Sequence, residues 1–259
     1  MSLIRLLRFR SAFFFLILAA TAQADWTIVS SASEPGRGGA VHRHVVLENS
    51  ARSDRITVDL AIFSTKSCTL RVLQNGDGAD SLGEVMRHEN CLAGVNGGYF
   101  DERFAPLGLR IANGQMIVPL QRARLISGVL VASPRGVQIL RSREFSRRAG
   151  VTAAIQCGPF LVDRGEQING LNDSHVARRS FAATTTSNRA LVGVCSGVSL
   201  AELSKILATT SFAEELRIER ALNLDGGSST GFWFARENGS VFSIPEQKAV
   251  RDFVGVVAK

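Results

Sequence analysis

The chain has 259 residues, of which 45% are hydrophobic and 20% charged, and its formal net charge is +7. This length is sufficient for a full hydrophobic core, which excludes the small folds that depend on disulfide or metal staples. The positive charge suits an anionic partner. No stripe of lysine and arginine with interleaved aromatic residues appears, so nucleic-acid binding is not expected. The basic segment RSREFSRR, residues 141–148, is interpreted as a solvated loop or strand edge.

Residues 1–24 have the features of a secretory signal peptide. A positively charged start, MSLIRLLRFR, precedes the apolar stretch SAFFFLILAATA and the small-x-small sequence AQA at residues 22–24. We therefore predict cleavage before Asp25 and a periplasmic or secreted mature domain at residues 25–259. Cleavage removes three arginines and no acids, which lowers the net charge from +7 to +4. The apolar stretch is short for a stable transmembrane helix, and an uncleaved anchor is the alternative.

Four cysteines follow the predicted cleavage site: Cys68, Cys91, Cys157 and Cys195. In an exported chain this even number permits two disulfides, with three pairings. No Cys-x-x-Cys sequence occurs, and the spacing does not suggest zinc. Since Cys157 and Cys195 lie in apolar runs, buried free thiols are the alternative.

Strand patterns dominate the mature chain. Residues 25–40, which include SSASEPGRGGA, are expected to form a loose N-terminal segment. The runs RITVDLAIFS and ALVGVCSG have the length and β-branched content of strands. Asn-Gly pairs, which favour tight turns between antiparallel strands, begin at residues 75, 96, 113, 169 and 238. The segments LRIANGQMIV and GFWFARENGSVFSI are therefore predicted hairpins.

Two helices are predicted, at residues 81–91 (SLGEVMRHENC) and 199–208 (SLAELSKILA). Each starts with a capping box, Ser81 with Glu84 and Ser199 with Glu202. With no repeat, linker or second domain in view, the fold class is α+β (mixed α/β). We expect a single domain dominated by a large, largely antiparallel or mixed sheet with few helices.

The segment ALNLDGGSSTG, residues 221–231, carries the most chemistry. Its GSSTG matches the serine-hydrolase elbow, but the following residues indicate a hairpin where the elbow needs a helix. All four histidines also precede Ser229, whereas α/β-hydrolases place the histidine last. Three interpretations stay open at this point: a phosphate cradle of backbone N–H groups, a carboxylate placed for catalysis, and a turn that closes a strand.

Several short motifs occur in a fixed order: NGGYF at 96–100, PLG at 106–108, Asn-Gly at 113–114, Gln156 with Gly158-Pro159, Arg179-Ser180, and ALNLDGGSS at 221–229. In this order they resemble the phosphodiester glycosidase family over residues 90–257. Two departures are Ser180, where many relatives have threonine, and Cys157 beside the Gly-Pro pair. The resemblance implies a mixed α/β domain and hydrolysis of the bond between a sugar anomeric carbon and a phosphodiester oxygen.

That reaction needs a carboxylate, as nucleophile or as base for water, and a group that stabilises phosphate charge. Asp225 is the first candidate for the carboxylate and Asp101 the second. Arg179 is the first candidate for the phosphate, with Arg178 and Arg110 behind it.

Residues of the same turns are candidates for substrate binding: Asn96, Gly97, Gly98, Tyr99, Arg178, Gly226, Gly227 and Ser228. The amide of Asn96 suits sugar hydroxyls, and the ring of Tyr99 suits a sugar face. The alternatives are a left-handed turn residue for Asn96, a core aromatic for Tyr99 and a turn-former for Asp225.

The histidines give little indication of a metal site or of a catalytic role. His42 and His44 share one face of a predicted strand, but no third ligand is near in sequence, so a metal site is not favoured. His175 is interpreted as an exposed loop residue, with a catalytic acid as the alternative. We expect no metal and no cofactor.

The sequence therefore predicts an exported hydrolase acting on sugar phosphodiesters of an envelope glycan or related polymer. The first alternative is a non-catalytic protein of the same fold that binds an anionic glycan or cell-wall fragment. The second is another hydrolase, including the serine type.

Overall fold

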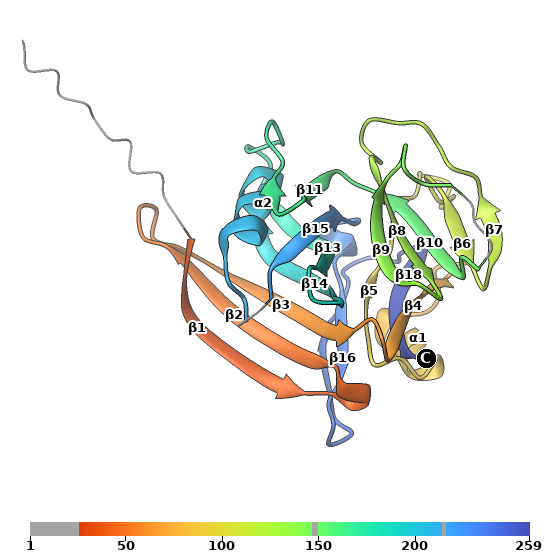
Figure 1. Ribbon diagram of the computed structural model, residues 1–259, viewed down its shortest axis with the longest axis horizontal. Helices are drawn as coiled ribbons and strands as arrows, with labels where there is room; N and C mark the ends of the chain where they lie inside the picture. The colour runs from red at the N-terminus through yellow and green to blue at the C-terminus, as the bar shows by residue number, and fades with distance from the viewer. Residues whose placement is uncertain (1–25, 147–149, 214–215) are drawn as a thin grey trace, which may run out of the picture.

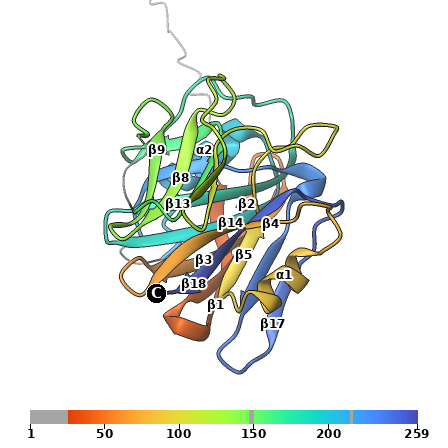
Figure 2. The ribbon, with the colours of Figure 1, turned by 90° about the vertical axis from the view of Figure 1, so that its right-hand side faces the viewer.

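The computed structural model describes residues 26–146, 150–213 and 216–259, and the predicted signal peptide lies outside them. Three antiparallel sheets make up most of this part of the chain (Figures 1 and 2). The first has eight strands in the order β1-β2-β3-β14-β13-β15-β11-β12. Their bounds are β1 Trp26–Pro35, β2 Val41–Asn49, β3 Asp54–Ser64, β11 Phe160–Asp163, β12 Glu166–Gln167, β13 Ala177–Thr185, β14 Arg189–Val198 and β15 Ile218–Asn223.

The two smaller sheets have five strands each. The second runs β7-β6-β10-β8-β9, from β6 Arg110–Ala112, β7 Gln115–Val118, β8 Gly128–Ser133, β9 Gly136–Arg141 and β10 Ala153–Cys157. The third runs β17-β16-β5-β18-β4, from β4 Cys68–Gln74, β5 Ala93–Asn96, β16 Phe232–Ala235, β17 Val241–Ile244 and β18 Asp252–Ala258. The predicted α+β class with a dominant sheet is confirmed.

Two α-helices occur in the described residues, α1 (Leu82–His88) and α2 (Leu200–Thr209), with short 3-10 turns η1 (Arg37–Gly39) and η2 (Gly227–Ser229). Both predicted capping boxes are present, because each N-cap serine accepts from the backbone N–H three residues on and that residue's glutamate accepts in return. No helix of the described residues is long and apolar enough to cross a membrane.

Both predicted hairpins form, β6–β7 and β16–β17. Asn113 and Gly114 take φ of 49° and 75°, the left-handed conformation that a tight hairpin turn requires. The loose N-terminal segment is a wrong prediction, since β1 pairs with β2 from Trp26 opposite Asn49 to Pro35 opposite Val41. The segment is ordered because β2 supplies hydrogen bonds along its whole length, although its own composition does not indicate a strand.

All four cysteines are free thiols in this structure and are almost fully buried. Cys68 and Cys157 lie in the large shared core, Cys195 in the cluster that α2 covers, and Cys91 in the cluster beside α1. Burial raises the pKa of Cys91, Cys157 and Cys195 to about 12. The disulfide interpretation is therefore not supported, and the alternative of buried thiols describes the structure.

One hydrophobic core joins the three sheets. It includes Phe63 and Leu222 of the first sheet, Leu130 of the second, and Val95 and Val254 of the third. Because all three sheets meet here, strands that are distant in sequence end close together. The ends of β5 and β15 and the start of β13 meet in this way.

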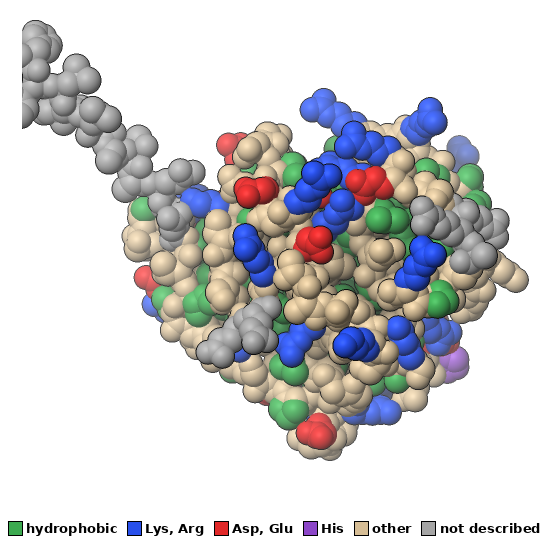
Figure 3. All heavy atoms as spheres, viewed as in Figure 1, with side chains coloured by type: hydrophobic (Ala, Val, Ile, Leu, Met, Phe, Trp, Pro, Cys, Tyr) green, Lys and Arg blue, Asp and Glu red, His purple; other side chains and the backbone are tan. Residues whose placement is uncertain are grey.

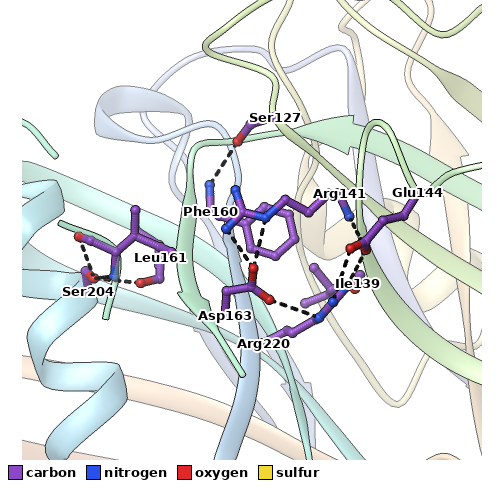
Figure 4. A network of polar contacts seen from close by, with 10 residues as sticks. Ser127, Ile139, Arg141, Glu144, Phe160, Leu161, Asp163, Ser204 and Arg220 are labelled. Carbon is purple, nitrogen blue, oxygen red and sulfur yellow. Dashed lines mark hydrogen bonds and ion pairs between the residues drawn. The ribbon is translucent and has the colours of Figure 1, made fainter. Parts of the chain in front are cut away.

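A polar network ties the second sheet to the first (Figure 4). Arg141 at the end of β9 binds Asp163 of β11 at 2.7 Å, and its guanidinium lies 4.4 Å from the Phe160 ring centroid. Arg220 of β15 binds Glu144 at 2.6 Å and Asp163 at 3.2 Å. The basic segment that starts at Arg141 was interpreted as a solvated loop or strand edge. Its first arginine does end the edge strand β9, where it also contacts the first sheet.

Candidate functional site

The register of β13 and β15 brings together two residues singled out from the sequence. Phe181 pairs with Asn223, and the Leu224 N–H donates to the Ser180 carbonyl at 2.8 Å. Continued by two residues in each direction, this antiparallel register places Arg179 opposite Asp225. The backbones of a phosphate-binding candidate and a carboxylate candidate thus lie across from each other at one end of the large sheet.

Asn96, at the end of β5, fixes the backbone of this site. It is fully buried, its Nδ2 donates to the Asp225 carbonyl at 2.8 Å, and its Oδ1 accepts from Ser180 Oγ at 2.6 Å. The same oxygen accepts from the Gly231 N–H at 3.2 Å. These bonds occupy the amide within the protein, so Asn96 joins the third sheet to both flanks of the site.

The Asp225 side chain is half-buried, and burial raises its pKa above the ordinary 3.8. Three neighbours oppose this shift. The Gly226 N–H donates to Oδ1 at 2.9 Å, the Ser229 hydroxyl lies beside the carboxylate, and Lys248 contributes positive charge. Asp252 reinforces the shift by repulsion. Desolvation dominates, so Asp225 is a stronger base than a solvated aspartate.

Two glycines shape the loop that follows Asp225. A Cβ on Gly226 would lie 2.9 Å from the Arg178 carbonyl oxygen and 3.8 Å from Arg179 Cδ, so the absence of a side chain lets the loop lie against β13. Gly227 has φ of 63°, and nothing lies within 4 Å of where its Cβ would be. Gly226 therefore allows close approach, while Gly227 turns the chain beside open space.

Arg179 is 7% exposed, and the hydrogen bonds found for its guanidinium within the described chain go to main-chain carbonyls. Nε donates to Val198 at 3.0 Å and Nη2 donates to His175 at 2.5 Å. Burial lowers the pKa of this arginine. None of the ion pairs found among the described residues gives it a carboxylate partner, and an uncompensated buried cation favours an anionic ligand.

Tyr99 lies near both Asp225 and Arg179, since the charges of both act on its hydroxyl. Its hydroxyl donates to the Gly158 carbonyl at 2.6 Å and accepts from Asn223 Nδ2 at 2.9 Å. Burial raises the pKa of Tyr99 strongly, and the negative charge of Asp225 adds to this shift. The ring packs against the shared core. The Tyr99 hydroxyl is therefore neutral and held in place, and it lies close enough to Asp225 for the carboxylate charge to act on it.

A buried ion pair supports the Gly97–Gly98 turn. Asp252, at the start of β18, accepts from the Gly98 N–H at 2.8 Å and from Arg110 Nε at 2.6 Å. A Cβ on Gly97 would lie 1.9 Å from Asp252 Oδ1, and one on Gly98 would lie 2.2 Å from Arg110 Nη2. Only glycines fit against this pair. Arg110, a reserve candidate for phosphate, is instead 2% exposed and neutralised.

Other predicted residues lie at the rim or behind it. Asp101 is exposed, and its Oδ1 accepts from the N–H groups of Arg103 and Ala105 in its own turn. Arg178 Nη2 donates to the carbonyls of Thr230 and Pro245, so it holds the loop after Asp225. Ser228 is half-buried, and its carbonyl accepts from the Gln247 N–H.

Three neighbours of Asp225 did not emerge from the sequence: Asp252, Lys248 and Asn223. Their signals are weak, namely a lone aspartate opening an apolar strand and a lone asparagine inside one. Asn223 Oδ1 and Ser229 Oγ are also buried without a hydrogen-bond partner of standard geometry in the described residues. Unsatisfied buried polar atoms are rare and here border the candidate carboxylate.

The competing interpretations gain no support. Ser229 Oγ is buried, and no hydrogen bond to a histidine is found for it in the described chain. His42 and His44 both bind Asp59 Oδ1, at 2.8 and 2.9 Å, and the described residues hold no group of three or more ligands arranged for a metal.

A surface hollow of 500 Å³ borders Thr184 and Arg220, at the opposite end of β13 from Arg179. The candidate site is defined here by its side chains.

The fold and the site define a class: an antiparallel α+β protein that presents a carboxylate and an arginine from adjacent strand ends. A profile of the phosphodiester glycosidase family matches residues 89–257, and the chain belongs to this family. This confirms the resemblance read from the ordered motifs.

Individual relatives are distant. The uncharacterized protein YigE of Escherichia coli is 37% identical over 91 residues, a match that covers 32% of this chain and only 36% of that protein. The catalytic domain of zebrafish N-acetylglucosamine-1-phosphodiester alpha-N-acetylglucosaminidase, auto-inhibited by its pro-peptide, superposes with a TM-score of 0.62 at 14% identity. That match covers 93% of this chain and 85% of the zebrafish chain.

A hypothetical protein from Synechocystis superposes with a TM-score of 0.59 at 15% identity, covering 90% of this chain and 68% of its own. At this level of identity, the two solved structures support the fold alone.

Proposed function

We propose that this protein is an exported hydrolase that cleaves the glycosidic bond of a sugar 1-phosphodiester in an envelope glycan or related polymer. One observation carries the proposal. Arg179, buried without a carboxylate partner among the described residues, lies across the continued β13–β15 register from Asp225, a half-buried carboxylate whose pKa burial raises. The pair supplies the two functions that cleavage of a glycosyl phosphodiester requires.

The roles follow from the chemistry of the bond. The C1–O bond breaks, its electron pair moves onto the phosphate oxygen, and a new C1–O bond forms from water. A phosphate leaving group is a weak base, so stabilising its charge contributes more than protonating it. Arg179 supplies that charge, and Asp225 acts on the anomeric carbon directly or through the water. Asp101 remains the second-carboxylate hypothesis, from its exposed turn.

The backbone around the pair would bind substrate. Gly227 borders open space close to Asp225, and Ser228 lies half-buried in the same loop, whereas Gly226 packs against β13 and donates its N–H to Asp225. Asn96, Gly97, Gly98 and Arg178 would act by holding this backbone in place, since their polar groups are bonded within the protein.

The test is hydrolysis of a panel of glycosyl phosphodiesters that differ in their sugar, followed by 31P NMR in 18O-labelled water. We expect free sugar carrying the label and an unlabelled phosphomonoester. Asp225→Asn should abolish turnover without loss of folding, and Asp54→Asn, an exposed carboxylate on the β2–β3 hairpin, is the matched control. Label in the phosphate, or wild-type turnover by Asp225→Asn, would refute the proposal. Binding without turnover that depends on Arg179 would assign a glycan-binding role.

Export is tested separately. Residues 1–24 carry the signal-peptide features, so the full chain expressed in a Gram-negative host should accumulate outside the cytoplasm. Intact-mass measurement should give a chain beginning at Asp25. A full-length cytoplasmic product would contradict the export hypothesis and leave the catalytic one standing.

A further inference from the structure

Lys248 is an exposed cation whose position relative to the candidate site is well defined. It lies in the segment that joins β17 to β18, and among the described residues no hydrogen bond or ion pair is found for its ammonium group. Exposure and charge alone do not distinguish it, because Figure 3 shows Lys and Arg side chains spread over one face of the molecule. What distinguishes Lys248 is the set of contacts around it.

The segment that carries Lys248 is bound to the loop that follows Asp225. The Gln247 N–H, one residue before Lys248, donates to the Ser228 carbonyl at 2.8 Å. The Arg178 guanidinium donates to one carbonyl of the loop and to one of the segment, which joins the two a second time. The chain at Lys248 is therefore held against the loop of the candidate carboxylate.

The Lys248 side chain contacts a second stretch that is bound to Asp225. Its Nζ lies 5.1 Å from the centroid of the Phe100 ring, within the range of a cation–π contact. Phe100 ends the NGGYF motif, and Gly97 of this motif accepts from the Asp225 N–H at 3.1 Å. The ammonium group thus borders both stretches that hold the Asp225 backbone. Its charge opposes the rise in the pKa of Asp225, as this position requires.

The proposed reaction needs more positive charge than Arg179 supplies. The phosphodiester carries one negative charge and the Asp225 carboxylate carries another, so with Arg179 alone one negative charge stays uncompensated. As the C1–O bond breaks, its electron pair adds further charge to the leaving phosphate. Uncompensated charge is costly where water is partly excluded. The Phe100 ring holds the Lys248 ammonium without neutralising it, whereas a carboxylate partner would do so.

We propose that Lys248 is the second phosphate ligand of the site, and that its ammonium group donates hydrogen bonds to a nonbridging oxygen of the phosphodiester. This rests on the proposed function and adds a residue to it. No proton is transferred, since Lys248 is an ammonium group before and after the reaction. The phosphate leaves as its monoester with the added charge paired to this cation.

The first test measures phosphate binding without chemistry, in Asp225→Asn, where Lys248 has no carboxylate charge to act on. Calorimetric titration with inorganic phosphate compares this protein with Asp225→Asn/Lys248→Met, which keeps the stem and removes the charge. We expect the affinity to fall about tenfold or more, because a charge-assisted hydrogen bond is lost. Lys248→Arg in the same background should bind within about threefold of Asp225→Asn. Equal affinity with and without the Lys248 charge, or no phosphate binding by Asp225→Asn, would overturn the inference.

The matched control is Lys66→Met in the same background. Lys66 is an exposed lysine in the turn that joins β3 to β4. Its replacement removes the same charge from the chain and should leave the phosphate affinity unchanged. An equal loss of affinity in the Lys66 and Lys248 variants would show a general charge effect and would also overturn the inference.

Turnover gives a separate readout in the active protein. For a glycosyl phosphodiester that the wild type cleaves, kcat/KM should fall about tenfold to a hundredfold in Lys248→Met and be largely retained in Lys248→Arg. Because Lys248 opposes the rise in the pKa of Asp225, Lys248→Met should also move the acid limb of the pH profile to higher pH. A loss of structure alone would not produce that shift.

The two proposals fail in different ways. Wild-type kinetics in Lys248→Met would overturn the inference and leave the proposed hydrolysis intact. If no diester is cleaved but phosphate binding still depends on Lys248, only the proposed function fails.

Discussion

Asn96 permits a quantitative test of how the site is held. Asn96→Ala removes three hydrogen bonds, to the Asp225 carbonyl, Ser180 Oγ and the Gly231 N–H, at a position that is fully buried. A net contribution of about 1 kcal/mol for each bond gives a loss of about 3 kcal/mol in the free energy of unfolding. A domain stable by roughly 5–15 kcal/mol still folds after that loss. The midpoint of thermal unfolding should fall by about 6–12 °C.

Urea denaturation at unchanged m-value measures this loss. Ser180→Ala, which removes only one of the three bonds, should cost about 1 kcal/mol. The double variant should then show a coupling of about 1 kcal/mol, because the two residues share that bond. Activity in Asn96→Ala should fall by about a hundredfold, since the Asp225 backbone loses a fixed position. A loss below about 1 kcal/mol, or full additivity of the two variants, would refute the view that Asn96 fixes the site.

Two further predictions concern charge. Inorganic phosphate should raise the thermal unfolding midpoint of the wild type but not that of Arg179→Met. In phosphate-free buffer Arg179→Met should be at least as stable as the wild type, because a buried unpaired cation is gone. An equal phosphate effect in both proteins would contradict this, and Arg55→Met, on the exposed β2–β3 hairpin, is the control. The pKa of Asp225 is raised above 3.8 in the folded state. At pH values between 3.8 and this raised pKa, the folded state therefore binds more protons than the unfolded state. Wild-type stability should therefore fall as pH rises through this interval, Asp225→Asn should lack that fall, and parallel pH–stability curves for the two proteins would show that Asp225 is not desolvated.

Local patterns predicted the elements whose causes are local. The capping boxes at Ser81 and Ser199 and the Asn-Gly turn at Asn113 depend on residues within a few positions of one another. The ordered motifs predicted the family and therefore the sheet-rich fold. The β1 strand was missed because it is ordered by pairing with β2, whose residues Val41–Asn49 lie later in the chain.

The site was predicted in its residue types more than in its contacts. The backbones of Asp225 and Arg179 lie across the same strand register, but Asn96 binds protein where we expected a sugar ligand. Its partners lie far along the chain, at Ser180 and Gly231, and no local pattern reports a contact of that separation. Asp252 was missed for the same reason, since its structural role depends on an ion pair with Arg110, which lies in another sheet. Asp101 forms a turn within its own few residues.

The position of β18 couples the site to complete synthesis of the domain. This strand, Asp252–Ala258, lies between β4 and β5 and follows every other described strand in the chain. Its first residue supports the Gly97–Gly98 turn, so that turn lacks its support until residue 252 has been added. Contacts this distant in sequence form late and slowly. A nascent or truncated chain therefore carries Asp225 and Arg179 without a finished site, and activity would appear only once the third sheet has closed.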